Sequence, residues 1–546
     1  MQQAKRRICF LLSALMLMSA LSGCAEREVP EEERFVLSAC VCGSVTTLDP
    51  AANTDARAES VFRAVYENLL RPDESGEGGE GGVAPVPGIA KEYREVVNFD
   101  GTVDYVFTLR SSARWSDGAR VKAKDFAYAW RRLADPANEL PNHALLSMVK
   151  GYDEVRATGD TSLLAVKADG DTTFRVTLAA PCAYFLAEVC TAVATMPLRS
   201  DAVTKDPQWT STISVLCNGP YRVGVWARES YLQLRRNASY YENRGTGPDV
   251  LRFLFAENRE EALRLYENGE ADYALSLPDG AESGGVVPLR ATACVLYNHM
   301  SEAFSNDHVR RAFDLSLDRA AVAAAAGAGM TPATGLVPPG VVELPTAGAD
   351  DFRTVGGALC AVDAEGYSMR CLEAEHELRD GGFWGGVGFS GVALLYVAGS
   401  ETRAAAAAAS AIWNERLKVP VTTEGVSREE FDRRIAAGEY DLALDTLAAR
   451  GGDAMDCLGD FAGTDGNNAI HYVNKPYDLL IGVAASSRDL AARAAFLHDA
   501  EALLLDDAAL TPLYFAGASC ALREGLSGVR YDCRGNVYFT AVSQDA

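Results

Sequence analysis

The chain has 546 residues, of which 48% are hydrophobic and 9% aromatic, a composition typical of folded rather than disordered proteins. Its 75 acidic residues outnumber its 51 basic ones, and the net charge of −24 argues against nucleic acid as a partner, because phosphate binding needs a basic surface. At roughly 150 residues per domain the length predicts about two to four structural units, and 13 cysteines are too few for a scaffold built on disulfides.

The N-terminal segment predicts export. A basic start at residues 5–7 precedes an apolar run over residues 8–20, which is too short to span a bilayer as a stable anchor. The run ends in Leu21-Ser22-Gly23-Cys24, which resembles the bacterial lipobox, where the cysteine is lipidated after cleavage. We therefore expect residues 1–23 to be a lipoprotein signal peptide, and residues 24–35 to hold the lipidated Cys24 and a solvated acidic tether.

Strand and helix signals alternate from Phe35 onward, which predicts α/β lobes rather than an all-α or all-β fold. One strand is expected to begin at Phe35, and the last long helix is rich in alanine and leucine. The further predicted strands cover residues 105–109, 174–178, 231–234, 392–397 and 441–444, and the predicted helices cover residues 58–70, 125–133, 309–319, 402–416 and 489–505.

The usual catalytic and metal-binding motifs are missing from the sequence. It contains no Gly-x-Ser-x-Gly, no His-Glu-x-x-His, no Walker A sequence and no zinc-type Cys-x-x-Cys. Ser147 and Lys150 fit the Ser-x-x-Lys motif of penicillin-binding proteins, but the partner motif Lys-Thr-Gly is absent, and the six histidines are scattered. We expect no enzyme activity, no bound metal and no cofactor.

Several short motifs, in order along the chain, match one protein family. They are Thr47-Leu48-Asp49-Pro50, Val86-Pro87-Gly88-Ile89-Ala90, Phe107-Thr108-Leu109-Arg110, Trp115-Ser116-Asp117-Gly118, Asn218-Gly219-Pro220-Tyr221, Val309-Arg310-Arg311-Ala312 and Thr511-Pro512-Leu513-Tyr514. With them the chain resembles the bacterial extracellular solute-binding proteins of family 5, the oligopeptide-binding lipoproteins of ABC importers. Most of these motifs have a structural interpretation: Trp115 to Gly118 reads as a tight turn with a packed Trp, and Asp318-Arg319 as a charge pair at a helix end.

The resemblance implies a two-lobe, periplasmic-binding-protein-like α/β fold that closes on its ligand like a flytrap, with an extra subdomain in the first lobe. Mapped onto this chain, residues 36–293 form lobe I with its inserted subdomain, residues 294–516 form lobe II, and residues 517–546 return to lobe I. The implied partners are an oligopeptide ligand and the permease and ATPase subunits of an ABC importer. We expect a monomer outside the cytoplasm, held on the cell membrane by its lipid.

Other functions fit the same resemblance. The protein could be a receptor lipoprotein that senses peptides without transporting them, or a binder of a non-peptide or anionic ligand. An exported hydrolase is the third alternative, against which the missing nucleophile and metal motifs argue.

The resemblance also places candidate ligand-binding residues. The family segment that pairs with the peptide as a strand falls on Thr54, Asp55 and Ala56. A second family pattern, Gly-Trp-Cys-x-Asp-Tyr, supplies an Asp for the peptide's α-amino group and falls on residues 446–451. Here Leu447 stands at the Trp position, Ala448 at the Cys position and Arg450 at the Asp position, and an arginine repels an ammonium.

Two interpretations of the missing carboxylate remain open. In one, the loop is rearranged and Asp445, Asp453 or Asp456 takes over the α-amino group. In the other, Arg450 faces the cleft and binds an anion such as a carboxylate. In some relatives a cysteine at the Cys294 position bridges to the cysteine now replaced by Ala448, so that bridge is absent, and a Cys294–Cys457 bridge is the alternative.

Overall fold

The computed structural model describes the chain from Arg34 to Asp545 apart from short gaps, which fall at residues 75–84, 183, 207, 212, 243–246, 279–280, 282–283, 345–349, 384–386, 390, 399–401, 450–451, 464–467, 488 and 533. The predicted signal peptide, Cys24 and Arg450 lie outside the described residues. Within the described part, no helix combines the length and the hydrophobicity needed to cross a membrane.

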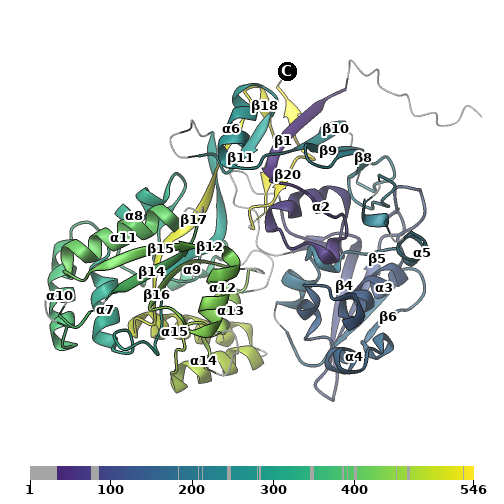
Figure 1. Cartoon of the computed structure of the whole chain (residues 1–546). Helices are drawn as coiled ribbons and strands as arrows, with labels where there is room; N and C mark the ends of the chain where they lie inside the picture. Colours follow the sequence, from purple (N-terminus) through teal and green to yellow (C-terminus); the bar gives the residue numbers. More distant parts are fainter. Residues whose placement is uncertain are drawn as a thin grey trace, which may run out of the picture.

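One mixed sheet runs through both halves of the molecule, in the order β15-β14-β16-β12-β17-β11-β1-β10-β9-β8, with β13 pairing with β17 beside this path. Figure 1 shows two bodies joined where the long strands β12 and β17 cross between them. In chain order the strands are β1 (Val36–Cys42), β8 (Tyr221–Ala227), β9 (Tyr231–Arg236), β10 (Val250–Phe255), β11 (Tyr273–Leu275), β12 (Gly285–Tyr297), β13 (Thr331–Pro332), β14 (Val392–Val397), β15 (Val421–Val426), β16 (Leu442–Ala448) and β17 (Leu510–Leu522).

The connection between the two bodies is the antiparallel pair of β12 and β17. Its register runs from Gly285 opposite Cys520 to Leu296 opposite Leu510, and it shifts between Pro288 and Thr292. Such irregularities bend a strand pair and increase its twist. We call the body before β12, together with the C-terminal segment, lobe I, and the body between β12 and β17 lobe II.

Lobe I carries a separate antiparallel sheet, β4-β5-β7-β6, against which helix α3 packs. Trp115 lies in a tight turn closed by a 2.8 Å bond from Gly118 N to its carbonyl oxygen, and its ring is buried, which confirms the interpretation of that motif. The C-terminal strands return beside α2, and their side chains join the lobe I core (Figure 1). The elements are α2 (Glu59–Val65), β4 (Ala90–Val97), β5 (Val103–Leu109), α3 (Ala123–Ala134), α4 (Tyr152–Thr158), β6 (Val166–Ala168), β7 (Thr173–Leu178), α5 (Ser200–Lys205), α6 (Arg259–Glu267), β18 (Leu526–Ser527), β19 (Arg530–Tyr531), β20 (Val537–Tyr538) and β21 (Ser543–Gln544).

Lobe II has helices on both faces of its part of the sheet. Alternation along β12 divides the core: Val295 packs on one face with α7, α8, α10 and α11, and Leu296 on the other with α9 and α12 to α15. The helices are α7 (Asp307–Leu315), α8 (Arg319–Ala326), α9 (Phe352–Gly356), α10 (Tyr367–Asp380), α11 (Thr402–Arg416), α12 (Arg428–Ala437), α13 (Met455–Leu458), α14 (Lys475–Ser486) and α15 (Leu490–Asp506).

Two predicted helices are wrong in extent. The helix expected over residues 58–70 ends at Val65, because Asn218 takes over the backbone beyond it: its side chain accepts from Glu67 N at 3.1 Å and donates to Glu67 O at 2.9 Å. The helix expected over residues 309–319 is two helices, since Asp318 caps the N-terminus of α8 by accepting from Ala321 N at 3.0 Å.

The cysteine expectation for lobe II is corrected as well. Cys294 and Cys457 are both free and buried, so the alternative bridge between them is not formed. The two thiols behave as small buried hydrophobic groups in the core of lobe II.

Candidate functional site

The three parallel strands of lobe II, β14, β15 and β16, end at the same edge of the sheet, beside the strand β12 that leads to lobe I. In open α/β sheets, ligands bind outside the carboxyl ends of such strands. Leu447 and Ala448, the two described members of the predicted pattern, lie at this edge opposite Thr292 and Ala291 of β12. Leu447 is half-buried and Ala448 is exposed, so Ala448 can contact a ligand.

Asp445, the first of the three candidate carboxylates, is engaged within lobe II. Its two oxygens accept from Arg428 at 2.9 and 3.3 Å. Burial raises the pKa of Asp445 although Arg428 opposes the shift. An ammonium ligand at this point has to compete with a guanidinium that is already in place.

Asp453, the second candidate, is buried in an ion pair. Arg493 donates to its two oxygens at 2.9 and 2.8 Å, and both side chains are buried. The same carboxylate accepts from Met455 N at 2.8 Å and so holds the first turn of α13. Because its charge and its hydrogen bonds are satisfied, Asp453 supports the site rather than offering a free carboxylate.

Asp456, the third candidate, lies on α13. It is near enough to Glu188, on the π-helical turn of residues Phe185–Val189 in lobe I, for its charge to act on the pKa of that glutamate. Burial, followed by the charges of Asp456 and Asp453, raises the pKa of Glu188 to about 10, while Arg534 opposes the shift. Atom Oε1 of Glu188 is buried and has no hydrogen-bond partner among the described residues. Carboxyl groups of the two lobes therefore interact electrostatically at this point.

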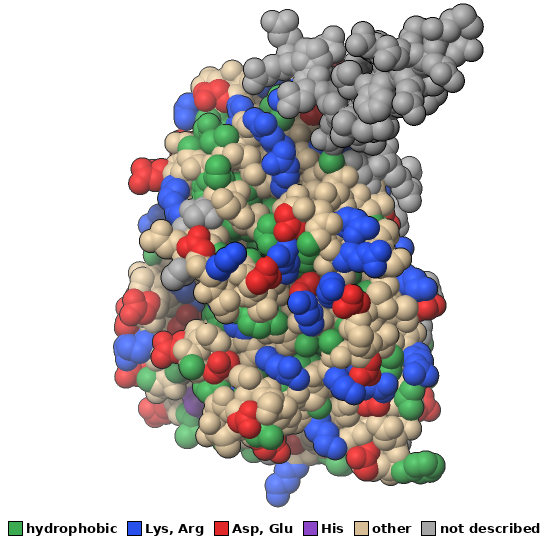
Figure 2. All heavy atoms as spheres, turned by 90° about the vertical axis from the view of Figure 1, so that its right-hand side faces the viewer, with side chains coloured by type: hydrophobic (Ala, Val, Ile, Leu, Met, Phe, Trp, Pro, Cys, Tyr) green, Lys and Arg blue, Asp and Glu red, His purple; other side chains and the backbone are tan. Residues whose placement is uncertain are grey.

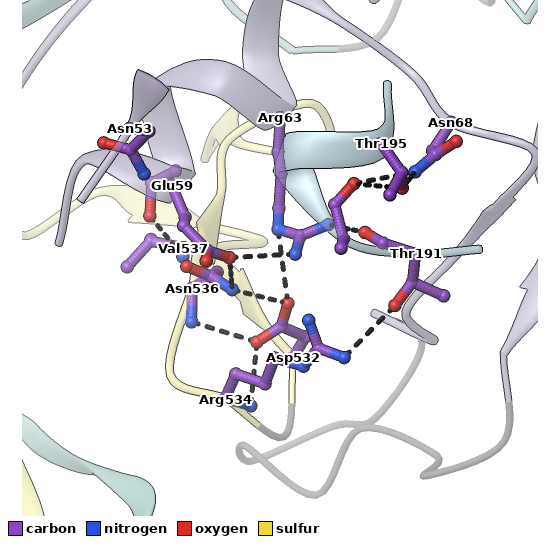
Figure 3. A network of polar contacts seen from close by, with 12 residues as sticks. Asn53, Glu59, Arg63, Asn68, Thr191, Thr195, Asp532, Arg534, Asn536 and Val537 are labelled. Atoms are coloured by element: carbon purple, nitrogen blue, oxygen red, sulfur yellow. Dashed lines mark hydrogen bonds and ion pairs between the residues drawn. The ribbon is translucent and has the colours of Figure 1, made fainter. Parts of the chain in front are cut away.

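A buried polar network holds the lobe I side of this contact in place (Figure 3). Arg534 donates to the carbonyl oxygen of Ala187 at 2.9 Å and to Thr191 Oγ1 at 3.1 Å, on either side of Glu188 in the chain. Behind it, Arg63 donates to Thr191 O at 3.2 Å and pairs with Glu59 at 2.9 Å. The C-terminal segment thus braces the turn that presents Glu188.

A thiol on the same segment as Glu188 is not set up for chemistry. Cys182 lies six residues before Glu188, and burial raises the pKa of its thiol to about 12, so it is protonated at neutral pH. Among the described residues, no group of three or more His, Cys, Asp or Glu side chains is arranged to hold a metal ion.

The predicted strand-pairing segment lies on lobe I, in irregular backbone between two short 3-10 turns. Thr54 is exposed, and Asp55 closes a local turn in which its side chain accepts from Arg57 N at 2.9 Å and its backbone N donates to Asn53 Oδ1 at 3.3 Å. Ala56 begins the second turn, and no hydrogen bond joins these residues to Leu447 or Ala448 across the described part of lobe II. Their pairing with a peptide stays a prediction.

Glu188 was not found by reasoning from the sequence. It belongs to no family motif quoted above, and a lone glutamate in an apolar stretch carries no signal of its own. Asp456 was named as one of three alternatives, and the other two carboxylates, Asp445 and Asp453, are paired with arginines of their own lobe.

Two α/β bodies joined by a pair of crossing strands are the architecture of a protein that encloses a solute. The comparison with known families agrees. Residues 84–469 match the model described as bacterial extracellular solute-binding proteins, family 5 Middle, and the chain belongs to this family.

Curated relatives and solved structures extend the match over nearly the whole length. The chain is 28% identical over 488 residues to the periplasmic oligopeptide-binding protein OppA of Salmonella typhimurium, covering 86% of this chain and 85% of the relative. It is 26% identical over 516 residues to the oligopeptide-binding protein OppA of Bacillus subtilis, covering 90% of each. The periplasmic murein tripeptide-binding protein MppA, in its unliganded open form, shares the fold with a TM-score of 0.76 at 22% identity, covering 94% of this chain and 98% of MppA.

Proposed function

We propose that the protein captures oligopeptides between its two lobes and delivers them to the permease and ATPase of an ABC importer. The curated relatives named above are oligopeptide-binding proteins, and the chain covers most of their length. The observation that carries the proposal in this chain is that Glu188 of lobe I and Asp456 of lobe II are near enough for their charges to interact. It gives the cleft a point of negative potential suited to the α-ammonium group of a peptide.

The energetic argument is that two adjacent carboxyl groups cannot both ionise without a cation nearby. An ammonium between Glu188 and Asp456 would neutralise both carboxylates and bind through charge-assisted hydrogen bonds, which are about twice as strong as neutral ones. In this proposal Asp456 binds the peptide's α-amino group, as the family's Asp does at the position that Arg450 occupies in this chain. The peptide backbone would then run along Thr54 to Ala56 on lobe I and past Leu447 and Ala448 on lobe II.

The remaining parts of the proposal concern assembly and location. We propose residues 36–293 with 517–546, and residues 294–516, as the two moving bodies; the buried cores divide close to these boundaries. We further propose a monomer anchored outside the cytoplasm through Cys24, without catalytic activity. On the face of lobe I shown in Figure 2, basic and acidic side chains are interspersed, which gives nucleic acid no continuous basic surface.

Calorimetry with matched peptides tests the proposal. Alanine peptides of three to five residues should bind with a free amino end and bind at least about tenfold more weakly when N-acetylated, because a desolvated charge pair is lost. Asp456→Asn should weaken the binding of peptides with a free amino end by a similar factor. Asp460→Asn, which makes the same change at an exposed residue nearby in the chain, should leave this binding unchanged. Recovery of intact peptides after incubation checks that no cleavage occurs.

The opposite result favours the other interpretation. If acidic or N-acetylated peptides bind best and Arg450→Ala abolishes that binding, the ligand is an anion recognised by Arg450. Free-amine peptides that bind equally well to wild type and Asp456→Asn would refute the role proposed for Asp456.

A further inference from the structure

The outer side of lobe I carries a hollow of about 710 Å³, lined mainly by residues of α3, β6 and α5. Figure 1 places these three elements on the side of lobe I that faces away from lobe II, so the hollow is separate from the candidate site at the edge of the lobe II sheet. Sites for small molecules in proteins have volumes of roughly 300–1,000 Å³. The hollow is therefore large enough to hold a small molecule.

One face of α3 forms the largest part of the lining. Lys124, Ala127, Tyr128 and Arg131 all line the hollow, and residues spaced three or four apart lie on the same face of a helix. Lys167 is contributed by β6. Along α3 the backbones of Lys124 and Arg131 are separated by two helical turns, roughly 10 Å. The wall therefore presents two basic groups at different positions along the helix.

The lining is basic although the chain as a whole is acidic. Its charged residues are Lys124, Arg131, Arg132, Lys167 and Asp135, whereas the chain has a net charge of −24. Arg132 is neutralised by Asp49, to whose oxygens it donates at 3.1 and 2.6 Å. Lys167 pairs with Asp169 at 2.7 Å, but its side chain is 71% exposed, and such surface pairs contribute little. The hollow therefore keeps an excess of positive charge.

Two of these basic residues have hydrogen-bond donors left over. Lys124 is exposed and forms no hydrogen bond or ion pair with another residue that the structure describes. Arg131 donates from Nη2 to Val166 O at 2.9 Å, which fixes its guanidinium group, while its Nε is buried and has no partner within the described part of the chain. Unpaired donors favour a ligand that brings acceptor atoms, because a buried donor without a partner costs free energy.

We propose that this hollow binds a small organic anion that carries two or more carboxylate or phosphate groups. Lys124 and Arg131 bind the charged groups through charge-assisted hydrogen bonds, and Lys167 adds positive charge from β6. The carbon part of the ligand packs against Ala127 and the half-buried ring of Tyr128. Two separated anionic groups on one molecule match two separated basic groups on one helix face.

The site belongs to lobe I alone. All of its lining residues lie within Lys124 to Val203, before the crossing strands β12 and β17. Binding there does not require the two lobes to close, so it goes beyond the function proposed above and can succeed or fail independently of peptide capture.

Calorimetry of the purified protein at constant ionic strength tests the site with citrate, pyrophosphate and acetate as probes. Citrate or pyrophosphate should bind at least about tenfold more tightly than acetate, because only they engage both basic groups. Lys124→Gln and Arg131→Gln should each weaken that binding by at least about tenfold. Lys91→Gln, which removes one positive charge from an exposed position on β4, should bind like wild type.

Lys124 is exposed, so Lys124→Gln tests the site without disturbing the core, and circular dichroism establishes that Arg131→Gln is folded. Absence of binding of both citrate and pyrophosphate to wild type would overturn the proposal. So would binding that persists unchanged in both Lys124→Gln and Arg131→Gln, because the anion would then be held elsewhere. Acetate that binds as tightly as citrate and pyrophosphate would exclude a site for an anion with several charged groups.

Discussion

Two glutamates of this protein, one buried and one half-buried, have different surroundings. Glu501, in the core of lobe II, meets Arg353 with distances of 2.8 and 2.7 Å and also accepts from Leu336 N and Val337 N at 2.8 Å each. Glu188 instead lies near the acidic groups Asp456 and Asp453 of the other lobe, and burial and these charges raise its pKa to about 10. The comparison teaches that a carboxylate with an arginine partner stabilises the fold as an ion, whereas one placed near other carboxylates is favoured in its protonated form.

The largest effect should come from breaking the structural pair. Glu501→Gln removes the charge opposite Arg353 and leaves a buried guanidinium uncompensated, so the free energy of unfolding should fall by about 3–5 kcal/mol. Urea denaturation followed by circular dichroism measures this change. Glu439→Gln, the same change in a solvent-exposed ion pair with Arg433, is the control and should leave the midpoint nearly unchanged. A midpoint that shifts equally in both variants would contradict the distinction.

An intermediate effect is expected where the crossing strands crowd a neighbouring loop. A Cβ at Gly517 of β17 would lie 2.4 Å from the carbonyl oxygen of Gly329, which is backbone and cannot turn away. Gly517→Ala should therefore lower the free energy of unfolding by about 1–3 kcal/mol. Gly482→Ala, in α14 with nothing within 4 Å of the new methyl group, should instead stabilise the helix by about 0.5–1 kcal/mol. Thermal melts of the two variants that shift in the same direction would refute the crowding argument.

The smallest effect should come from Glu188, and it should depend on pH. Its stabilising contribution as a protonated group is complete below pH 4.5 and declines as the pH rises toward about 10. Glu188→Gln should melt at the same temperature as wild type at pH 5 and at a higher temperature at pH 8, where the difference in the free energy of unfolding should stay below about 1 kcal/mol, because Glu188 is only half-buried and solvent screens its charge. Differential scanning calorimetry at the two pH values checks this. A wild type that gains stability relative to the variant as the pH rises would reverse the sign and exclude the assignment.

Local sequence patterns predicted several elements well. The strand over residues 392–397 and the helix over residues 402–416 coincide with β14 and α11, because an apolar β-branched run and an alanine-rich run each favour one conformation by themselves. The end of α2 could not be predicted in this way, since it depends on Asn218, more than 150 residues away. The break before α8 had a local signal, the capping residue Asp318, which the helical pattern around it obscured.

For the candidate site, too, some features were predicted from the sequence and others required the tertiary structure. The sequence by itself determined the family, the α/β character and a strand over residues 441–444, which the structure extends to Ala448, because these follow from motifs and hydrophobic periodicity along the chain. Which carboxylates of lobe II are held by arginines, and that Asp456 lies near Glu188, was decided by the tertiary structure alone. Ion pairing and the opposition of two lobes depend on residues that are distant in the chain and adjacent in space, and no local pattern records their distances.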